Sequence, residues 1–247
     1  MALLAACAGG PCASHHTRTE SDQNDSDRRV AVRMELASGY FSRGQYATAL
    51  DEIKQALQIR PDLREALNLR SLVYAAMGEN EIAEEGFRRA LSLDARDADT
   101  AHNYGWFLCQ TGREQRSIAY FMAAAKNPLY TTPTRPFTNA GICSLALKDD
   151  KAAEDYLSTA LRLSPTNTQA LYWLADIAYR KGRLQEARQL TTDIEKMMEP
   201  TAEVLWLALR IERKLGNREA EARYSSQLRR RFAGSPEQRL LLQGQYD

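Results

Sequence analysis

Several kinds of functional residue are scarce in this chain of 247 residues. It has only three histidines, and His15 and His16 lie together in a polar stretch near the start. Its four cysteines form no CxxC pair and have no histidine at a spacing that suits zinc. No glycine-rich loop of the kind that cradles phosphates is present. We therefore expect no metal site, no cofactor and no enzymatic activity.

A surplus of charge of either sign is also missing. The chain has 33 basic and 32 acidic residues, which gives a formal net charge of +1. Nucleic-acid binding draws much of its affinity from basic side chains on phosphates, so we expect no nucleic-acid partner. No apolar run approaches the roughly 18 residues that a membrane-spanning helix needs. The composition is that of an ordinary soluble domain.

A repeat with a period of 34 residues organises most of the chain. Gly44 recurs as Gly78 and Gly112, and Ala49 recurs as Ala83 and then as Ser117. Between these positions, apolar residues follow the i, i+3, i+4, i+7 pattern of amphipathic helices. Each glycine stands where a first helix ends, because a left-handed C-cap suits glycine best. The pattern predicts pairs of antiparallel helices joined by short turns, with no β-strand.

This period and pattern resemble the tetratricopeptide repeat. We therefore expect an all-α, right-handed superhelical solenoid of six helix-turn-helix repeats and a C-terminal helix. The expected repeats cover residues 30–63, 64–97, 98–133, 134–167, 168–200 and 201–234. Extra residues before the fourth repeat fall in NPLYTTPTRP, whose three prolines predict a stiff, non-helical connection. In the sixth repeat Gly216 stands one place late, as suits a degenerate terminal unit.

The first 29 residues differ from the rest of the protein. Residues 13–28 hold no large apolar residue and predict a disordered tether. Before them, Leu4-Ala5-Ala6-Cys7 resembles a bacterial lipobox, which implies that Cys7 carries a lipid. The stretch before Cys7 has no basic residue and is shorter than a signal peptide requires. We therefore expect either that translation starts upstream of Met1 and the protein is lipid-anchored, or that it is cytoplasmic.

Two segments are more specific than the repeat. They are NYGWFLC at residues 103–109, and NPLY at 127–130 followed by NAGIC at 139–143. Together they resemble the PilF/PilW type of type IV pilus biogenesis lipoprotein, the pilotin. The resemblance implies a place on the periplasmic side of the outer membrane. It implies binding to pilus secretin subunits, promotion of secretin multimers, and contact with other pilus assembly proteins.

Two other functions stay open at this stage. One is a generic tetratricopeptide scaffold or co-chaperone in the cytoplasm, with its cysteines reduced. The other is a periplasmic protein that stabilises the pilus fibre without touching the secretin. In each case we expect a protein-binding monomer.

The resemblance also implies a binding groove. In such repeats, positions 2, 5, 9, 12 and 13 of each first helix face the concave side, with position 6 beside them. An apolar, aromatic groove suits an amphipathic helix or an extended hydrophobic peptide. Position 5 holds no Lys or Arg, so we expect no clamp for a C-terminal carboxylate. The predicted groove residues are Met34, Phe41, Asn68, Leu72, His102, Asn103, Trp106, Asn139, Ile142, Tyr172 and Tyr179.

Cys109 and Cys143 occupy positions 12 and 10 of two adjacent first helices. Such helices pack side by side, so in an oxidising compartment we expect a disulfide between the third and fourth repeats.

Overall fold

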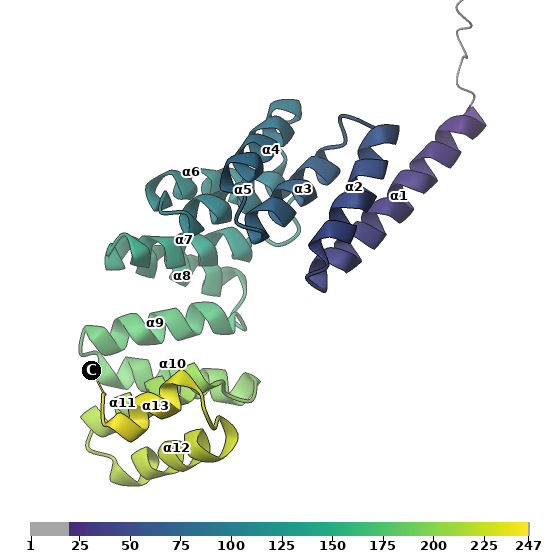
Figure 1. Cartoon of the computed structure of the whole chain (residues 1–247). Helices are drawn as coiled ribbons and strands as arrows, with labels where there is room; N and C mark the ends of the chain where they lie inside the picture. Colours follow the sequence, from purple (N-terminus) through teal and green to yellow (C-terminus); the bar gives the residue numbers. More distant parts are fainter. Residues whose placement is uncertain (1–19, 247) are drawn as a thin grey trace, which may run out of the picture. The chain divides into compact units, whose positions relative to one another are not determined.

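The computed structural model describes residues 20–246, which form helices joined by short turns (Figure 1). Within these residues no strand occurs. The protein divides into two compact units that meet in sequence between Ala83 and Glu84. The helices are α1 (Glu20–Ser42), α2 (Tyr46–Ile59), α3 (Arg64–Ala76), α4 (Asn80–Leu93), α5 (Ala98–Gln110), α6 (Glu114–Ala125), α7 (Thr134–Ala146), α8 (Asp150–Leu163), α9 (Thr168–Arg180), α10 (Leu184–Met197), α11 (Ala202–Lys214), α12 (Arg218–Arg231) and α13 (Pro236–Gln243).

The first unit holds α1, α2, α3 and the start of α4. The core of this unit is small and aliphatic: Ala37 of α1 and Ala49 of α2 are fully buried, as is Ile53. Alanine at a helix crossing lets two backbones approach closely, so α1 and α2 pack as a tight hairpin. Val30 of α1 is also buried, and Arg33 reaches Glu52 of α2 at 2.7 Å.

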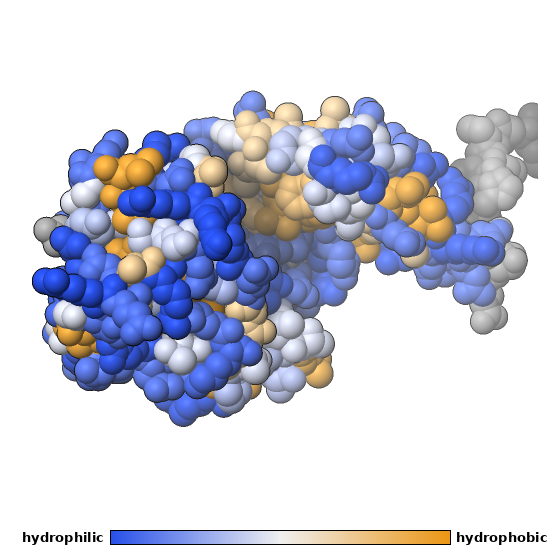
Figure 2. Space-filling view, turned by 90° about the horizontal axis from the view of Figure 1, so that it is seen from below, coloured by the Kyte–Doolittle hydropathy of each residue, from blue (hydrophilic) through white to orange (hydrophobic). Residues whose placement is uncertain are grey.

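The second unit continues the same hairpins from α5 to α12. Consecutive helices lie side by side in Figure 1, and the largest buried side chains include Tyr104, Phe121 and Leu157. The first helices α5, α7, α9 and α11 begin at intervals of 36, 34 and 34 residues. Equivalent side chains therefore recur along one side of the unit. Figure 2 shows a mostly hydrophilic surface on which the hydrophobic residues gather in separate patches.

The turns explain why the glycines recur. Gly44, Gly78, Gly112 and Gly182 all have φ between +71° and +83°, the left-handed region that glycine enters without strain. In the fourth hairpin the equivalent residue is Lys148, with φ of 60°. The last helix, α13, starts as its sequence suggests: the Ser235 hydroxyl accepts the Gln238 N–H, and Pro236 occupies the first turn.

Three sequence-based expectations were wrong in detail. Helix α1 begins at Glu20, so residues 20–28 of the expected tether are helical. Glu, Gln and Arg extend a helix readily once its apolar part is packed, and Asp27 pairs with Arg60, the residue that follows α2. The remainder of the expected tether lies outside the described residues.

The other two corrections concern the end of the connection before α7 and the start of the sixth repeat. Helix α7 begins at Thr134, so Pro136 lies in its first turn, where a missing N–H breaks no helical hydrogen bond. Helix α11 begins at Ala202, 34 residues after Thr168, so Gly216 is in register rather than one place late. The turn after α10 ends one residue later than we expected.

Candidate protein-binding site

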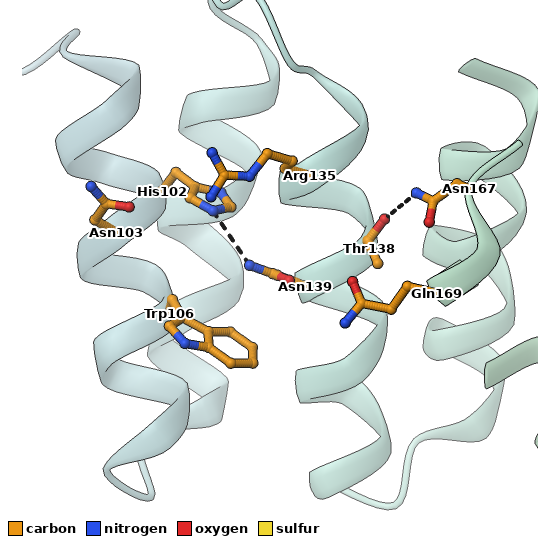
Figure 3. Close-up of a pocket in the computed structure, with 8 residues that line it drawn as sticks. All are labelled: His102, Asn103, Trp106, Arg135, Thr138, Asn139, Asn167 and Gln169. Atoms are coloured by element: carbon orange, nitrogen blue, oxygen red, sulfur yellow. Dashed lines mark hydrogen bonds between the residues drawn. The ribbon is translucent and has the colours of Figure 1, made fainter. Parts of the chain in front are cut away.

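A pocket of about 350 Å³ opens on the first helices of three successive hairpins in the second unit (Figure 3). Its walls come from α5, α7 and the start of α9. Four of the residues predicted from the sequence line it: His102, Asn103, Trp106 and Asn139. The structure adds four others that sequence reasoning did not single out: Arg135, Thr138, Asn167 and Gln169.

Behind the pocket, α6 packs closely against α5, and α8 packs closely against α7. A Cβ on Gly105 would lie 2.9 Å from the Phe121 ring, and one on Gly141 would lie 2.5 Å from Leu157. Only glycine allows the second helices α6 and α8 to approach this closely. Cys109 and Cys143 form a disulfide between α5 and α7, with their Cα atoms 5.9 Å apart.

His102 forms the closed side of the pocket and is only 2% exposed. Its ring packs against Phe121 and Tyr130, with centroids 5.7 Å and 6.1 Å away. Burial, reinforced by the positive charge of Arg135, lowers the pKa of His102 to about 4. The imidazole is therefore neutral near pH 7. The Asn139 side-chain amide donates to its Nε2 at 3.4 Å, which leaves the ring proton on Nδ1.

Thr138 and Asn167 join α7 to α9 beside the pocket. The Asn167 side-chain amide donates to the Thr138 hydroxyl at 2.8 Å, as Figure 3 shows. The Oδ1 atom of the same Asn167 caps α9 by accepting the Ala170 N–H at 3.1 Å. Both ends of Asn167 are therefore used within the protein, so its role here is to position α9 against α7.

The remaining lining residues offer groups to a ligand. Gln169 and Arg135 are exposed, while Trp106, Asn103 and Asn139 are half-buried. Carboxamides can donate to and accept from a peptide main chain, and an indole ring packs against an apolar side chain. The arrangement offers both polar and apolar contacts to an extended polypeptide segment.

A second pocket of about 440 Å³ adjoins the first and shares Gln169 with it. Tyr172 and Trp173 of α9 line it, together with Met198 and Val204. Met198 is 42% exposed, which is high for a large apolar side chain. Of the predicted groove residues, Tyr172 thus belongs to this second pocket.

Other predicted groove residues lie elsewhere. Tyr179 is buried, because Arg210 and Lys214 of α11 cover its ring at 4.7 Å and 4.2 Å, so the expected groove exposure is wrong for it. Ile142 is half-buried on α7 and lines neither pocket described above.

In the first unit, Met34 and Phe41 pack half-buried against the core, and Asn68 and Leu72 are half-buried on α3. A pocket of about 470 Å³ between α2 and α3 contains none of these four residues. Cys7 lies outside the described residues.

The residues that sequence reasoning missed did carry a signal. Arg135 and Gln169 stand at position 2 of α7 and α9, a position expected to face the groove. Reading that position across all repeats would have found both. Asn167 precedes its helix and has no repeat position, so only its capping preference points to it.

Comparisons with known proteins identify the fold and the family. Tetratricopeptide-repeat family models match residues 65–97 and 144–204. PilF of Pseudomonas aeruginosa, a type IV pilus assembly protein, is 30% identical over 225 residues, which cover 89% of each protein.

Two solved structures of proteins from the same family have a similar fold. The P. aeruginosa PilF structure superposes with a TM-score of 0.80 and 28% identity, over 89% of this protein and 99% of that one. The structure of PilW, a widely conserved type IV pilus biogenesis factor, superposes with a TM-score of 0.79 and 32% identity, over 86% of this protein and 98% of that one.

The hairpins and these matches define a tetratricopeptide-repeat protein, a class of protein-binding scaffolds. Within that class, the chain belongs to the PilF/PilW family of type IV pilus biogenesis proteins. Among the described helices, none combines the length and apolar character needed to cross a membrane. No group of three or more metal-ligating side chains is found in the same part of the protein.

Proposed function

We propose that this protein is the pilotin of a type IV pilus system. In this role it binds secretin subunits on the periplasmic side of the outer membrane and promotes their assembly into multimers. Membership of the PilF/PilW family supports a role in pilus biogenesis. The observation that carries the binding role is the pair of adjoining pockets on α5, α7, α9 and α11.

The pockets suit a polypeptide partner for a physical reason. A segment laid across the first helices meets carboxamides on the α5 and α7 side, which can replace the water lost by its main chain. It then meets the apolar side chains of Tyr172, Trp173 and Met198, which contribute hydrophobic burial. Both contributions come from one side of the second unit, so a single continuous segment of a secretin subunit can make them.

The amount of heat-resistant secretin multimers in outer-membrane fractions tests this role. Deletion of the gene should abolish the multimers, or leave the secretin in the inner membrane. Trp106→Ala and Gln169→Ala should each reduce the multimers severalfold, whereas Lys151→Ala, an exposed change on α8, should not. Each variant is first shown to melt like the native protein. Normal multimers in the deletion strain would contradict the proposal and favour a fibre-stabilising role without secretin contact.

The lipid anchor is part of the proposal and needs its own test. Cells expressing the complete gene are labelled with radioactive palmitate, and the protein is recovered from membrane fractions. The native protein should carry the label and Cys7→Ser should not. A protein that is unlabelled and stays in the cytoplasmic fraction would contradict outer-membrane anchoring and favour a generic scaffold.

A further inference from the structure

The lining of the first pocket carries a single formal charge. Arg135 is cationic, while Asn103, Asn139 and Gln169 are neutral carboxamides. His102 is neutral as well, because its pKa is about 4. No aspartate or glutamate lines the pocket. An anionic group entering it therefore meets one positive charge and no negative one.

Arg135 differs from Arg113 and Arg180, two arginines of neighbouring hairpins, in having no ionic partner. Arg113 pairs with Glu84, and Arg180 pairs with Asp150 at 2.7 Å and Asp176 at 2.9 Å. Among the described residues, no carboxylate lies within ion-pair distance of the exposed Arg135 guanidinium. Asp99 interacts with it only at longer range. The guanidinium thus keeps its full bidentate capacity for an incoming carboxylate.

A second donor, on His102 of α5, also lacks a partner in the described part of the protein. His102 is only 2% exposed, and its Nδ1 atom is buried without a hydrogen-bond partner among the described residues. A buried donor without a partner destabilises the folded protein, so an acceptor that reaches it recovers that cost. Figure 3 shows the Arg135 guanidinium beside the His102 ring. The exposed Arg135 guanidinium therefore favours an oxygen acceptor at the α5–α7 side of the pocket, next to a histidine whose Nδ1 has no partner in the part of the protein that the structure describes.

The adjoining pocket supplies the other half of the recognition. It lies on the far side of Gln169 and presents Tyr172, Trp173, Met198 and Val204. Its volume of about 440 Å³ is ample for one large apolar side chain. A segment with its carboxylate at Arg135 passes Gln169 before it reaches this pocket.

We propose that these pockets read a short extended segment of the partner that carries a carboxylate for Arg135 and a large apolar side chain for the pocket around Tyr172. This inference rests on the proposed function and names the chemistry of the segment that the secretin would offer. It departs from the expectation drawn from position 5, because the cation stands at position 2. The carboxylate comes from an Asp or Glu side chain or from the C-terminus of the partner polypeptide.

Random nonapeptides displayed on phage separate these sources. One library has its C-termini fused to the coat protein, and the other presents free C-termini. Selections use the native protein, Arg135→Gln, Met198→Ser, and Arg89→Gln as a matched change of an exposed arginine on α4. We expect the native and Arg89→Gln proteins to enrich peptides with Asp or Glu, or with free C-termini, together with Trp, Phe or Leu. Arg135→Gln should lose the acidic preference, and Met198→Ser the apolar one.

Affinities of synthetic peptides complete the test. Replacing the selected carboxylate by its amide should raise Kd about tenfold or more on the native protein, as expected for a charge-assisted hydrogen bond. The same replacement should change Kd less than twofold on Arg135→Gln. Equal acidic enrichment on both proteins, or no enriched peptide on the native protein, would overturn the inference.

The two proposals fail in different ways. If secretin multimers depend on this protein but the selections show no carboxylate preference, the pilotin role stands and the recognition chemistry is wrong. If carboxylate peptides bind through Arg135 but multimers form without the protein, the chemistry stands and the partner is a different one.

Discussion

Cys109 and Cys143 join α5 to α7, the two helices that carry opposite walls of the first pocket. His102, Asn103 and Trp106 lie on the same helix as Cys109, and Arg135 and Asn139 lie on the same helix as Cys143. The bond spans 34 residues, including the long connection between α6 and α7. It therefore holds together the place in the second unit where the spacing of the first helices widens from 34 to 36 residues.

Reducing this disulfide should destabilise the protein. Closing a loop of this length stabilises a folded protein by about 4 kcal/mol in the chain-entropy treatment, and often by less in practice. We expect the reduced protein to unfold at a lower urea concentration than the oxidised protein. Thiol counting confirms the state of each sample. Equal unfolding midpoints for oxidised and reduced protein would contradict a structural role for the bond.

Gly141 should not tolerate a methyl group. An alanine Cβ would lie 2.5 Å from Cγ of Leu157 and 3.3 Å from the Ala153 carbonyl oxygen. Overpacking of this kind costs about 1–3 kcal/mol, more than the roughly 1 kcal/mol that alanine gains in helix propensity. Gly141→Ala should therefore lower the free energy of unfolding, measured by urea denaturation.

Gly39 is the matched control for that change. It also lies within a helix, but an added Cβ would meet only the flexible end of Arg43, no nearer than 3.6 Å. Gly39→Ala should leave stability unchanged or raise it by up to about 1 kcal/mol. If both substitutions have the same effect, close packing is not the reason for glycine at position 141.

Replacing Lys148 by glycine should stabilise the protein. It adopts φ of 60° at the turn between α7 and α8, where the other hairpins have glycine. A left-handed conformation costs a residue with a Cβ about 1–2 kcal/mol, which glycine's larger unfolded-state entropy only partly offsets. Lys148→Gly should raise the free energy of unfolding by roughly 0.5–1 kcal/mol. A drop in the thermal midpoint would show instead that the lysine side chain stabilises this turn.

Stability should fall between pH 6.5 and pH 5 because of His102. Its folded pKa of about 4 lies below the unfolded value near 6.5, so the unfolded protein binds a proton first as the pH drops. The loss is absent above pH 6.5 and grows to about 3 kcal/mol near pH 4, at 1.36 kcal/mol per pKa unit.

Denaturation at several pH values, with His102→Gln as the comparison, measures this dependence. His102 is the only histidine within the described residues, and carboxylates titrate mostly below this window. The variant should show a flatter profile from pH 6.5 to pH 5. An identical slope for both proteins would contradict a buried neutral imidazole.

Most of the fold is local and could be predicted from the sequence. The 34-residue period follows from glycine at each turn and small residues at each crossing. These residues act within one hairpin, so their spacing can be read without the structure. The repeat register also places Cys109 and Cys143 at similar positions of two adjacent first helices, so their pairing could be predicted from the sequence.

The site was less predictable because it depends on neighbouring helices. Tyr179 has the right position for a groove, but Arg210 and Lys214 of the next first helix cover it. Conversely, His102 lines the pocket although it is almost fully buried. A repeat position indicates a direction, whereas exposure depends on the size of the side chains across the interface.

The most direct test of the account is the affinity of the purified protein for detergent-solubilised secretin subunits. The native protein, Trp106→Ala, Gln169→Ala and the Lys151→Ala control are compared by surface plasmon resonance. We expect saturable binding by the native protein and the control, with Kd raised about tenfold by each pocket variant, as for the loss of roughly 1.4 kcal/mol of contact free energy. No binding by the native protein, or equal Kd values for all four, would contradict it.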